Sequence, residues 1–190
     1  ELEREVTGPC HHALYVTDFP GISEQNRRVY RTIAGLLNDA RTEVVGESPY
    51  FVLKEEGAAL VHSVTQRGVN LQVLTNSLQS TDAFYTVATL WRGLGNVADT
   101  GLTLRAFQVL RKGTVEGMAT RVVDSARWGI HSKRAVIDGR ELLIGTYNID
   151  PRSANLNSEM IFVCRDGPEI AEAARADILA RMQESTAVAE

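Results

Sequence analysis

Two side chains that could act together on an anionic substrate, an imidazole and an ammonium group, occur at His131 and Lys133. They lie two residues apart in a stretch that we predict to be a strand, so both should leave the same face of it. Lys133 could then hold a negative charge while His131 reacts with the bound group. Each residue alone has a simpler explanation, because a His on a strand is more often structural and a neighbouring Lys is usually a solvated surface charge.

A second pair of polar residues follows on the predicted return strand. The Asp138-Gly139 step is a strong hairpin signal and joins the two predicted strands. Thr146 and Asn148 share a face, and hairpin pairing can make it the face that carries the first pair. Their hydroxyl and amide groups can hydrogen-bond phosphoryl oxygens, and Gly145 leaves room for a ligand or a backbone segment to approach.

The elements that must position these residues alternate between helix and strand, which indicates an α/β fold with a mixed β-sheet sandwiched between helices. Apolar residues at helical spacing predict the helices, and alternating or β-branched residues predict the strands. Residues 111–127 have no clear period and predict a loop. We expect helices over 23–40, 55–67, 81–94 and from Pro168 onward, and strands over 42–47, 69–75, 102–107, 128–137, 141–147 and 160–164.

Three parts of the chain follow from this pattern. Gly and Pro residues punctuate positions 1–21, which predicts a linker or an entering segment. Residues 22–186 form the predicted domain, and residues 187–190 a frayed tail. The start is charged and has no apolar run, so we expect no signal peptide, and the missing initiator Met suggests a trimmed chain.

Composition excludes several classes of protein. The chain has 190 residues, of which 44% are hydrophobic and 23% charged, which is ordinary for a soluble globular domain. No apolar run is long enough to span a bilayer. The net charge of -4 argues against nucleic-acid binding by the whole surface. Cys10 and Cys164 are isolated, which predicts neither a disulfide framework nor a zinc site and fits exposure to the cytosol.

The spacing of these residues resembles the HKD motif of the phospholipase D superfamily. The matching residues are His131-Ser132-Lys133, Asp138 after four residues, and Gly145-Thr146-Tyr147-Asn148 after six more. Thr146 stands where the family usually has Ser, so the hydroxyl is kept. The residues from Asn148 to Glu159, with the upstream stretches Tyr15–Asp18 and Leu74–Asp82, resemble the second half of bacterial cardiolipin synthases. Residues 22–186 are thus expected to be a phospholipase D-like domain with one HKD motif.

The resemblance implies a mechanism through a phosphohistidine intermediate. His131 would attack phosphorus, and Lys133 and Asn148 would hold the non-bridging oxygens. Glu159 matches the family carboxylate that hydrogen-bonds the nucleophilic His. Thr146 would support the phosphate pocket, and Asp138, at the turn, would be structural. The resemblance implies no metal and no cofactor.

A second His is needed as general acid and base, and this chain has no second HKD motif. Either the chain is one half of a two-motif enzyme, which we favour, or two copies share one site around a two-fold axis. The favoured activity is phosphatidyl transfer that makes cardiolipin. The alternatives are a phosphodiesterase or nuclease that works as a homodimer, and a non-catalytic lipid-binding module.

Other residues are assigned supporting roles. Asn76 and Ser77, with Asp82, follow a predicted strand at the edge where open α/β sheets bind ligands. They could line the substrate pocket, or they could form a turn and cap a helix. Arg152 and Asn157 are expected to brace the loop after the hairpin.

The charge distribution predicts the partners. Residues 105–134 carry seven basic and two acidic side chains in a chain of net charge -4. A basic stretch beside a phosphate-binding motif suits an anionic phospholipid headgroup and peripheral contact with a membrane, although a solvated basic face would look the same. We expect the cytoplasmic face of the membrane, and no nucleic acid as partner.

Overall fold

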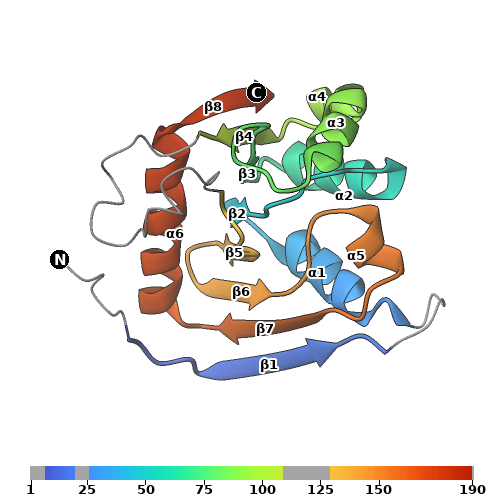
Figure 1. Cartoon of the computed structure of the whole chain (residues 1–190). Coiled ribbons are helices and arrows are strands. Elements are labelled where there is room, and N and C mark those ends of the chain that lie inside the picture. Colours follow the sequence, from blue (N-terminus) through green and yellow to red (C-terminus); the bar gives the residue numbers. More distant parts are fainter. Residues whose placement is uncertain (1–6, 20–25, 109–128, 190) are drawn as a thin grey trace, which may run out of the picture.

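The computed structural model describes residues 7–19, 26–108 and 129–189, and in them a mixed sheet of eight strands lies between helices (Figure 1). The order across the sheet is β1-β7-β6-β5-β2-β3-β4-β8. This arrangement confirms the predicted fold class. The strands are β1 (His12–Thr17), β2 (Glu43–Glu47), β3 (Asn70–Asn76), β4 (Thr103–Phe107), β5 (Arg134–Ile137), β6 (Glu141–Gly145), β7 (Met160–Arg165) and β8 (Ser185–Ala189).

The centre of the sheet is parallel and its flanks are antiparallel. Strands β2, β3 and β4 run parallel, because helices connect them. Strand β5 joins β2 in antiparallel register, with Gly46 opposite Ala135, and the hairpin adds β6 next to it. The segment that carries His131 and Lys133 therefore leads into the sheet beside β2, at the boundary between its parallel and antiparallel parts.

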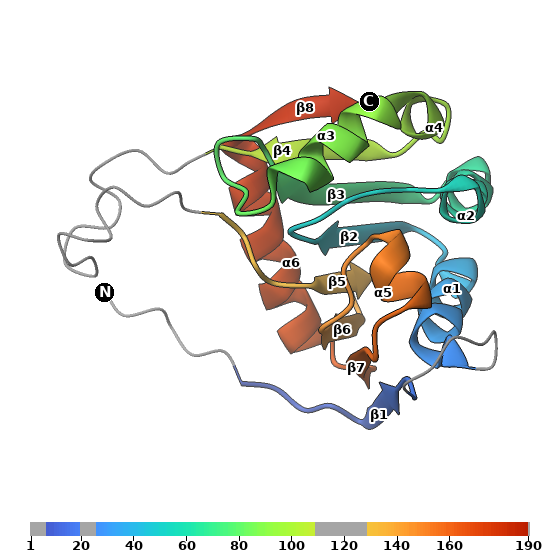
Figure 2. The ribbon, with the colours of Figure 1, turned by 45° about the vertical axis from the view of Figure 1, so that its right-hand side comes forward.

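Helices cover both faces of the sheet (Figure 2). On one face α6 packs on β2, β4, β5, β6 and β8, and buries Ala174, Ile178 and Met182. On the other face α1 and α2 pack over a core that includes Val29, Leu36 and Val64. The helices are α1 (Arg28–Asp39), α2 (Glu55–Gln66), α3 (Phe84–Arg92), α4 (Leu94–Ala98), α5 (Pro151–Asn155) and α6 (Pro168–Gln183).

Several boundaries differ from the prediction. The helix expected over 81–94 is divided into α3 and α4 at Gly93, a residue of low helix propensity. The strand expected over 128–137 begins only at Arg134 among the described residues. The short helix α5 was not predicted; the Asp150 carboxylate caps it by accepting from the backbone N–H of Ser153 at 2.7 Å.

Both ends of the described part of the chain belong to the sheet. Within residues 1–21, the segment His12–Thr17 is the edge strand β1, antiparallel to β7, so the entering segment is part of the sheet. The prediction of a frayed tail over 187–190 was wrong for residues 187–189, which belong to β8 on β4. Arg105 stabilises the start of β8 by donating hydrogen bonds to the hydroxyl and carbonyl oxygens of Ser185, both at 2.8 Å. The loop predicted over 111–127 lies outside the described residues.

The two cysteines are joined, which corrects their interpretation as isolated residues. Cys10 and Cys164 form a disulfide with Cα atoms 5.5 Å apart, although 154 positions separate them in the sequence. The pairing of β1 with β7 brings them together, because His12 lies opposite Arg165. Because the two cysteines are far apart in the sequence, the disulfide could not be predicted from their spacing; the pairing of β1 with β7 makes it possible.

Within the described ranges, no helix is both long and apolar enough to cross a bilayer.

Candidate active site

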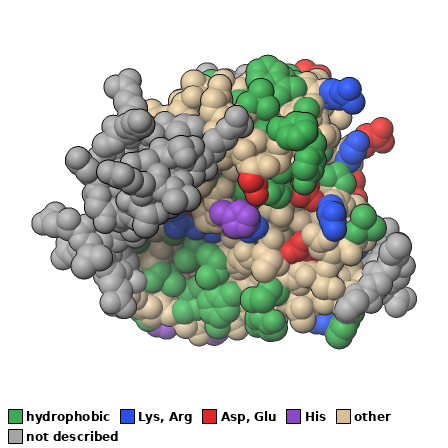
Figure 3. All heavy atoms as spheres, in the orientation of Figure 1, with side chains coloured by type: hydrophobic (Ala, Val, Ile, Leu, Met, Phe, Trp, Pro, Cys, Tyr) green, Lys and Arg blue, Asp and Glu red, His purple; other side chains and the backbone are tan. Residues whose placement is uncertain are grey.

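His131 and Lys133 lie in the segment that enters β5. The His131 side chain is exposed, and the Lys133 Nζ donates to the His131 carbonyl oxygen at 2.7 Å. The hairpin pairing continues one step beyond β5, since the Gly145 N–H donates to the Lys133 carbonyl at 3.0 Å. Figure 3 shows one face of the molecule with an imidazole near its centre and acidic and basic side chains around it.

Asn76, at the end of β3, holds the segment that precedes His131. Its amide accepts from the Ile130 N–H at 3.0 Å and donates to the Ile130 carbonyl at 2.9 Å. The same segment passes so close to Ser80 that a Cβ on Gly129 would lie 1.9 Å from the Ser80 carbonyl oxygen. Ser77 is buried and bonds Ser80 in a turn. Both predicted substrate contacts, Asn76 and Ser77, therefore bond the protein itself, and their contact with a substrate stays a prediction.

Glu47, which was not predicted as a site residue, holds the other side of the segment. Its carboxylate is fully buried and accepts from the Ser132 hydroxyl, from Arg134 at 2.6 Å and from Arg181 on α6 at 2.9 Å. An acidic residue at the end of the apolar strand β2 was the available signal. Its partners could not be read from the sequence, because they are 85 and more residues away.

Four further residues form a chain of hydrogen bonds beside the hairpin. The Thr146 hydroxyl donates to Glu159, which is almost fully buried. Asn157 donates to the other Glu159 oxygen at 2.9 Å, and Arg152 donates to Asn157 at 3.2 Å. In the part of the chain that the structure describes, Glu159 makes no hydrogen bond to His131. Its bonds instead join the two sides of the loop.

Backbone hydrogen bonds and a β-bridge fix the segment that contains Asn148. The Asn148 N–H donates to Ser153 at 3.2 Å, and the neighbouring Ile149 pairs with Phe51 in an isolated bridge. The side-chain oxygen of Asn148 is buried and has no hydrogen-bond partner among the described residues. A buried polar atom without a partner is costly, so this oxygen is an exception to the usual pairing of buried polar groups.

The charges around Lys133 act in opposite directions. Burial disfavours its ammonium form and holds the pKa of Lys133 below its usual value, while the carboxylates of Glu159 and Asp82 partly offset this effect. Tyr50 donates to Asp82 at 3.0 Å, and burial together with this bond raises the pKa of Tyr50 to about 12. Asp82, Glu159 and Lys133, from three separate parts of the sequence, therefore share one electrostatic environment.

Asp138 and Gly145 contribute to the hairpin itself. Asp138 has a positive φ of 51° at the turn, and its carboxylate accepts from the N–H groups of Arg41 at 2.9 Å and Thr42 at 2.8 Å. Burial opposes its ionisation, but these bonds outweigh burial and lower the pKa of Asp138. A Cβ on Gly145 would lie 2.2 Å from the Met160 carbonyl oxygen, so the close approach here is that of the β7 backbone.

Over residues 7–19, 26–108 and 129–189, no three His, Cys, Asp or Glu side chains gather in a group that could hold a metal ion. Most of the basic stretch over 105–134 lies outside these ranges.

The arrangement has relatives among known proteins. The family model described as cardiolipin synthase, PLD-like domain, matches residues 33–181. Cardiolipin synthase C of Escherichia coli (strain K12) is 32% identical over 116 residues, which are 61% of this chain and 24% of that protein. Cardiolipin synthase A of Proteus mirabilis is 23% identical over 156 residues, 82% of this chain and 28% of that protein. The chain thus spans about a quarter of the length of these curated relatives.

Solved structures share the fold at low identity. Nuc from Salmonella typhimurium, a phospholipase D family member, has a TM-score of 0.65 and 15% identity, and the match covers 94% of this chain and 100% of that one. Phosphatidylserine synthase from Haemophilus influenzae has a TM-score of 0.63 and 14% identity, with 93% of this chain and 40% of that chain covered. With the family match over most of its length, the chain belongs to the phospholipase D-like domains of the cardiolipin synthase family.

Proposed function

We propose that this domain supplies one half of a phosphatidyltransferase of the cardiolipin synthase type. The imidazole of His131 forms a bond to the phosphorus of a phospholipid, and the bond from phosphorus to the leaving alcohol breaks. A second alcohol then attacks the phosphohistidine, forms the new phosphodiester and releases His131. The single observation that carries the proposal is geometric: His131 is exposed, and the ammonium group of Lys133 lies beside it, bonded to the His131 carbonyl oxygen at 2.7 Å.

Lys133 and Asn148 are the groups proposed to hold the non-bridging oxygens. Lys133 is a partly desolvated cation, which interacts more strongly with a phosphate than a fully solvated one does. The unpartnered oxygen of Asn148 means that the scaffold does not fix the orientation of its amide through that atom, so the NH₂ group can turn towards a phosphoryl oxygen. Thr146 and Glu159 support these groups through their own hydrogen bond.

Glu159 is proposed to act on His131 only when the site is complete. Its two oxygens are bound by Thr146 and Asn157, and Arg152 holds Asn157 in turn. A carboxylate can accept further bonds at each oxygen, so one to a His131 ring N–H is chemically open. In that arrangement Glu159 orients the ring and stabilises the charge that the imidazole acquires.

The second His is proposed to come from another HKD half. The leaving alcohol needs a proton, and the incoming alcohol must lose one. The remaining His residues, His11, His12 and His62, have no Lys two positions later, and His62 lies on the exposed side of α2. The greater length of the relatives favours a second half in the same protein.

The membrane and the compartment are also proposals. A phospholipid substrate requires peripheral contact with a bilayer. The Cys10–Cys164 disulfide favours an oxidising compartment, because the cytosol keeps thiols reduced, and this argues against the cytoplasmic face that we expected. Alkylation of free thiols during cell lysis, followed by non-reducing electrophoresis, tests this point: trapping both cysteines as thiols would restore the cytoplasmic assignment.

The test of the function uses the full-length protein with phosphatidylglycerol vesicles, alone or with a second phospholipid, and with DNA in a parallel reaction. We expect a lipid product, and an acid-labile phosphoprotein that is absent in His131→Ala. Cleavage of DNA without a lipid product would favour a nuclease instead. Unchanged lipid turnover in His131→Ala would show that the domain is a non-catalytic module.

A phosphodiesterase that works as a homodimer is the second candidate. The observation in its favour is that this chain matches the whole length of Nuc, a phospholipase D family chain of similar size with the same fold. Two copies could then supply the two His residues around a two-fold axis. Mixing His131→Ala with unmodified protein distinguishes the cases, because a shared site between copies would lose activity in proportion to the mixed dimers formed.

A further inference from the structure

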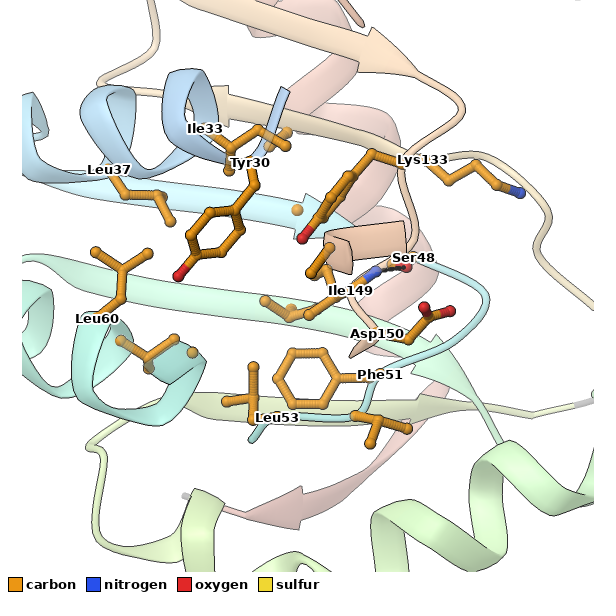
Figure 4. A pocket seen from close by; sticks show the side chains of 18 of the residues that line it. Tyr30, Ile33, Leu37, Ser48, Phe51, Leu53, Leu60, Lys133, Ile149 and Asp150 are labelled. Atoms are coloured by element: carbon orange, nitrogen blue, oxygen red, sulfur yellow. Dashed lines mark hydrogen bonds between the residues drawn. The ribbon is translucent and has the colours of Figure 1, made fainter. Parts of the chain in front are cut away.

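A cavity of about 190 Å³ lies between α1, α2 and the face of the sheet opposite α6. Figure 4 shows its lining, in which Tyr30, Ile33 and Leu37 come from α1 and Leu60 from α2, while Phe51 follows β2 and Ile149 precedes α5. Protein interiors seldom keep voids larger than a water molecule, and an apolar cavity of about 150 Å³ already binds benzene. The space is therefore large enough for several methylene groups and chemically suited to them.

The floor of the cavity is open because two small residues face each other on it. Gly46 on β2 lies opposite Ala135 on β5, and both line the cavity. A Cβ on Gly46 would meet its nearest neighbour, the Arg134 carbonyl oxygen, at 3.5 Å, which is ordinary contact. Backbone packing therefore does not require a glycine at position 46. The small size of Gly46 and Ala135 leaves space in the cavity and is not needed for pairing of the strands.

The cavity adjoins the candidate phosphate site through Lys133. This residue precedes Ala135 by two positions, so it shares the face of the strand that borders the cavity. In Figure 4 its stem starts at the edge of the cavity and its ammonium group points away from it. A group held by the ammonium would lie one side-chain length from an apolar space.

Charged side chains lie at the rim of the cavity, between the helices. Arg27 forms an ion pair with Glu56 of α2 at 2.8 Å, donates to the Ala154 carbonyl at 3.0 Å, and stacks on the Tyr30 ring at 4.2 Å. These contacts tie α1, α2 and α5 together at the rim. An occupant of the cavity must then be apolar along its body and limited in length.

We propose that the cavity binds a segment of one acyl chain of the phospholipid whose phosphodiester is held at Lys133. This proposal rests on the proposed function and adds to it a subsite for the lipid tail. A single acyl chain fits the combination of apolar walls, limited volume and an adjacent cation for an anionic headgroup.

Binding of a fluorescent fatty acid to the full-length protein tests the proposal without relying on catalysis. The probe is cis-parinaric acid, measured with the unmodified protein, His131→Ala, Ala135→Leu and Ala176→Leu. Ala135→Leu fills the cavity, whereas Ala176 is exposed on α6 and provides a matched control. We expect about tenfold weaker binding only in Ala135→Leu. Equal binding by Ala135→Leu and the unmodified protein would overturn the proposal, as would no binding by the unmodified protein.

Two further measurements cover failures of folding and of the proposed function. If Ala135→Leu does not fold by circular dichroism, Gly46→Val fills the same floor. If neither variant folds, unlabelled fatty acids of increasing length displace the probe from the unmodified protein, and affinity should rise and then level off; no dependence on length would overturn the proposal. Phosphatidylglycerol turnover that is lost in His131→Ala and retained in Ala135→Leu would overturn the acyl subsite alone. Probe binding at the cavity without any lipid turnover would overturn only the transferase.

Discussion

The side chains of residues 132–135 alternate between the two faces of the sheet, and their surroundings on the two faces differ. On the α6 face, Ser132 and Arg134 bond a buried carboxylate at Glu47, and Arg181 completes its set of donors. On the other face, Lys133 and Ala135 border a cavity. The α6 face satisfies its polar groups and so stabilises the segment, while the other face leaves groups and space available for a ligand.

Replacing Lys133 by Met should have the largest effect, and it should affect activity alone. The variant removes the cation proposed to stabilise the developing charge, so we expect roughly 1000-fold slower phosphoryl transfer, equivalent to about 4 kcal/mol. Stability should not fall, because burial of the ammonium already disfavours its charged form. Transfer assays with the full-length protein and thermal unfolding measure the two quantities. A variant that loses stability in proportion to activity would contradict the division between the faces.

Replacing Glu47 by Gln should give the opposite pattern. Two arginines would lose a buried counter-charge, so we expect a loss of roughly 3 kcal/mol, or about 6 to 12 °C in the melting temperature. Asp177→Asn is the matched control, since Asp177 pairs with the same arginines but is half exposed, and it should cost about 1 kcal/mol or less. Equal losses in the two variants would show that burial of Glu47 is not what matters.

Replacing Cys10 by Ser should destabilise the edge of the sheet without touching the site. Removal of a cross-link between residues far apart in the sequence frees the unfolded chain, and we expect a loss of about 2 kcal/mol. Unfolding with and without reductant checks this, because the reductant should lower the melting temperature of the unmodified protein and leave the variant unchanged. A reductant effect that persists in Cys10→Ser would contradict the assignment.

At the far end of the hairpin, Asp138→Asn should cost about 1 kcal/mol, since an amide oxygen can keep some of the bonds but loses the charge. The lowered pKa of Asp138 gives this loss a pH dependence. The ionised carboxylate stabilises the fold above the ordinary Asp pKa, and the contribution disappears as the pH falls through the lowered value. Chemical unfolding of both proteins at neutral and acidic pH should therefore show a difference that shrinks in acid. A difference that grows in acid would exclude this role.

The smallest effect is a shift in a pH profile. The Glu159 carboxylate raises the pKa of Lys133, so Glu159→Gln should lower that pKa and move the alkaline decline of kcat/KM to lower pH. Asp82→Asn should shift it in the same direction, because its charge acts in the same sense. The quantity to compare is the pH at which kcat/KM declines, and not the maximum value of kcat/KM. A shift to higher pH in either variant would rule out the shared electrostatic environment.

Much of the fold followed from local patterns. The Asp138-Gly139 step predicted the hairpin turn, and local residue patterns predicted helices over 55–67 and from Pro168 onward. The structure confirms the turn, α2 and α6. The features that were not predicted are contacts between distant segments: β8 on β4, the bonds of Asn76 to Ile130, and the disulfide. The periodicity of apolar residues within one segment carries no information about contacts with a distant segment.

The sequence by itself determined which chemical groups the candidate site contains and that His131 and Lys133 stand two positions apart, because residue types and their order are properties of the chain alone. Only the tertiary structure decided what surrounds them. Glu47 and Asn76 reach the segment from β2 and β3, and the cavity exists because two small residues meet across β2 and β5. These relations depend on strand order and register, which many weak contacts over the whole sheet establish together.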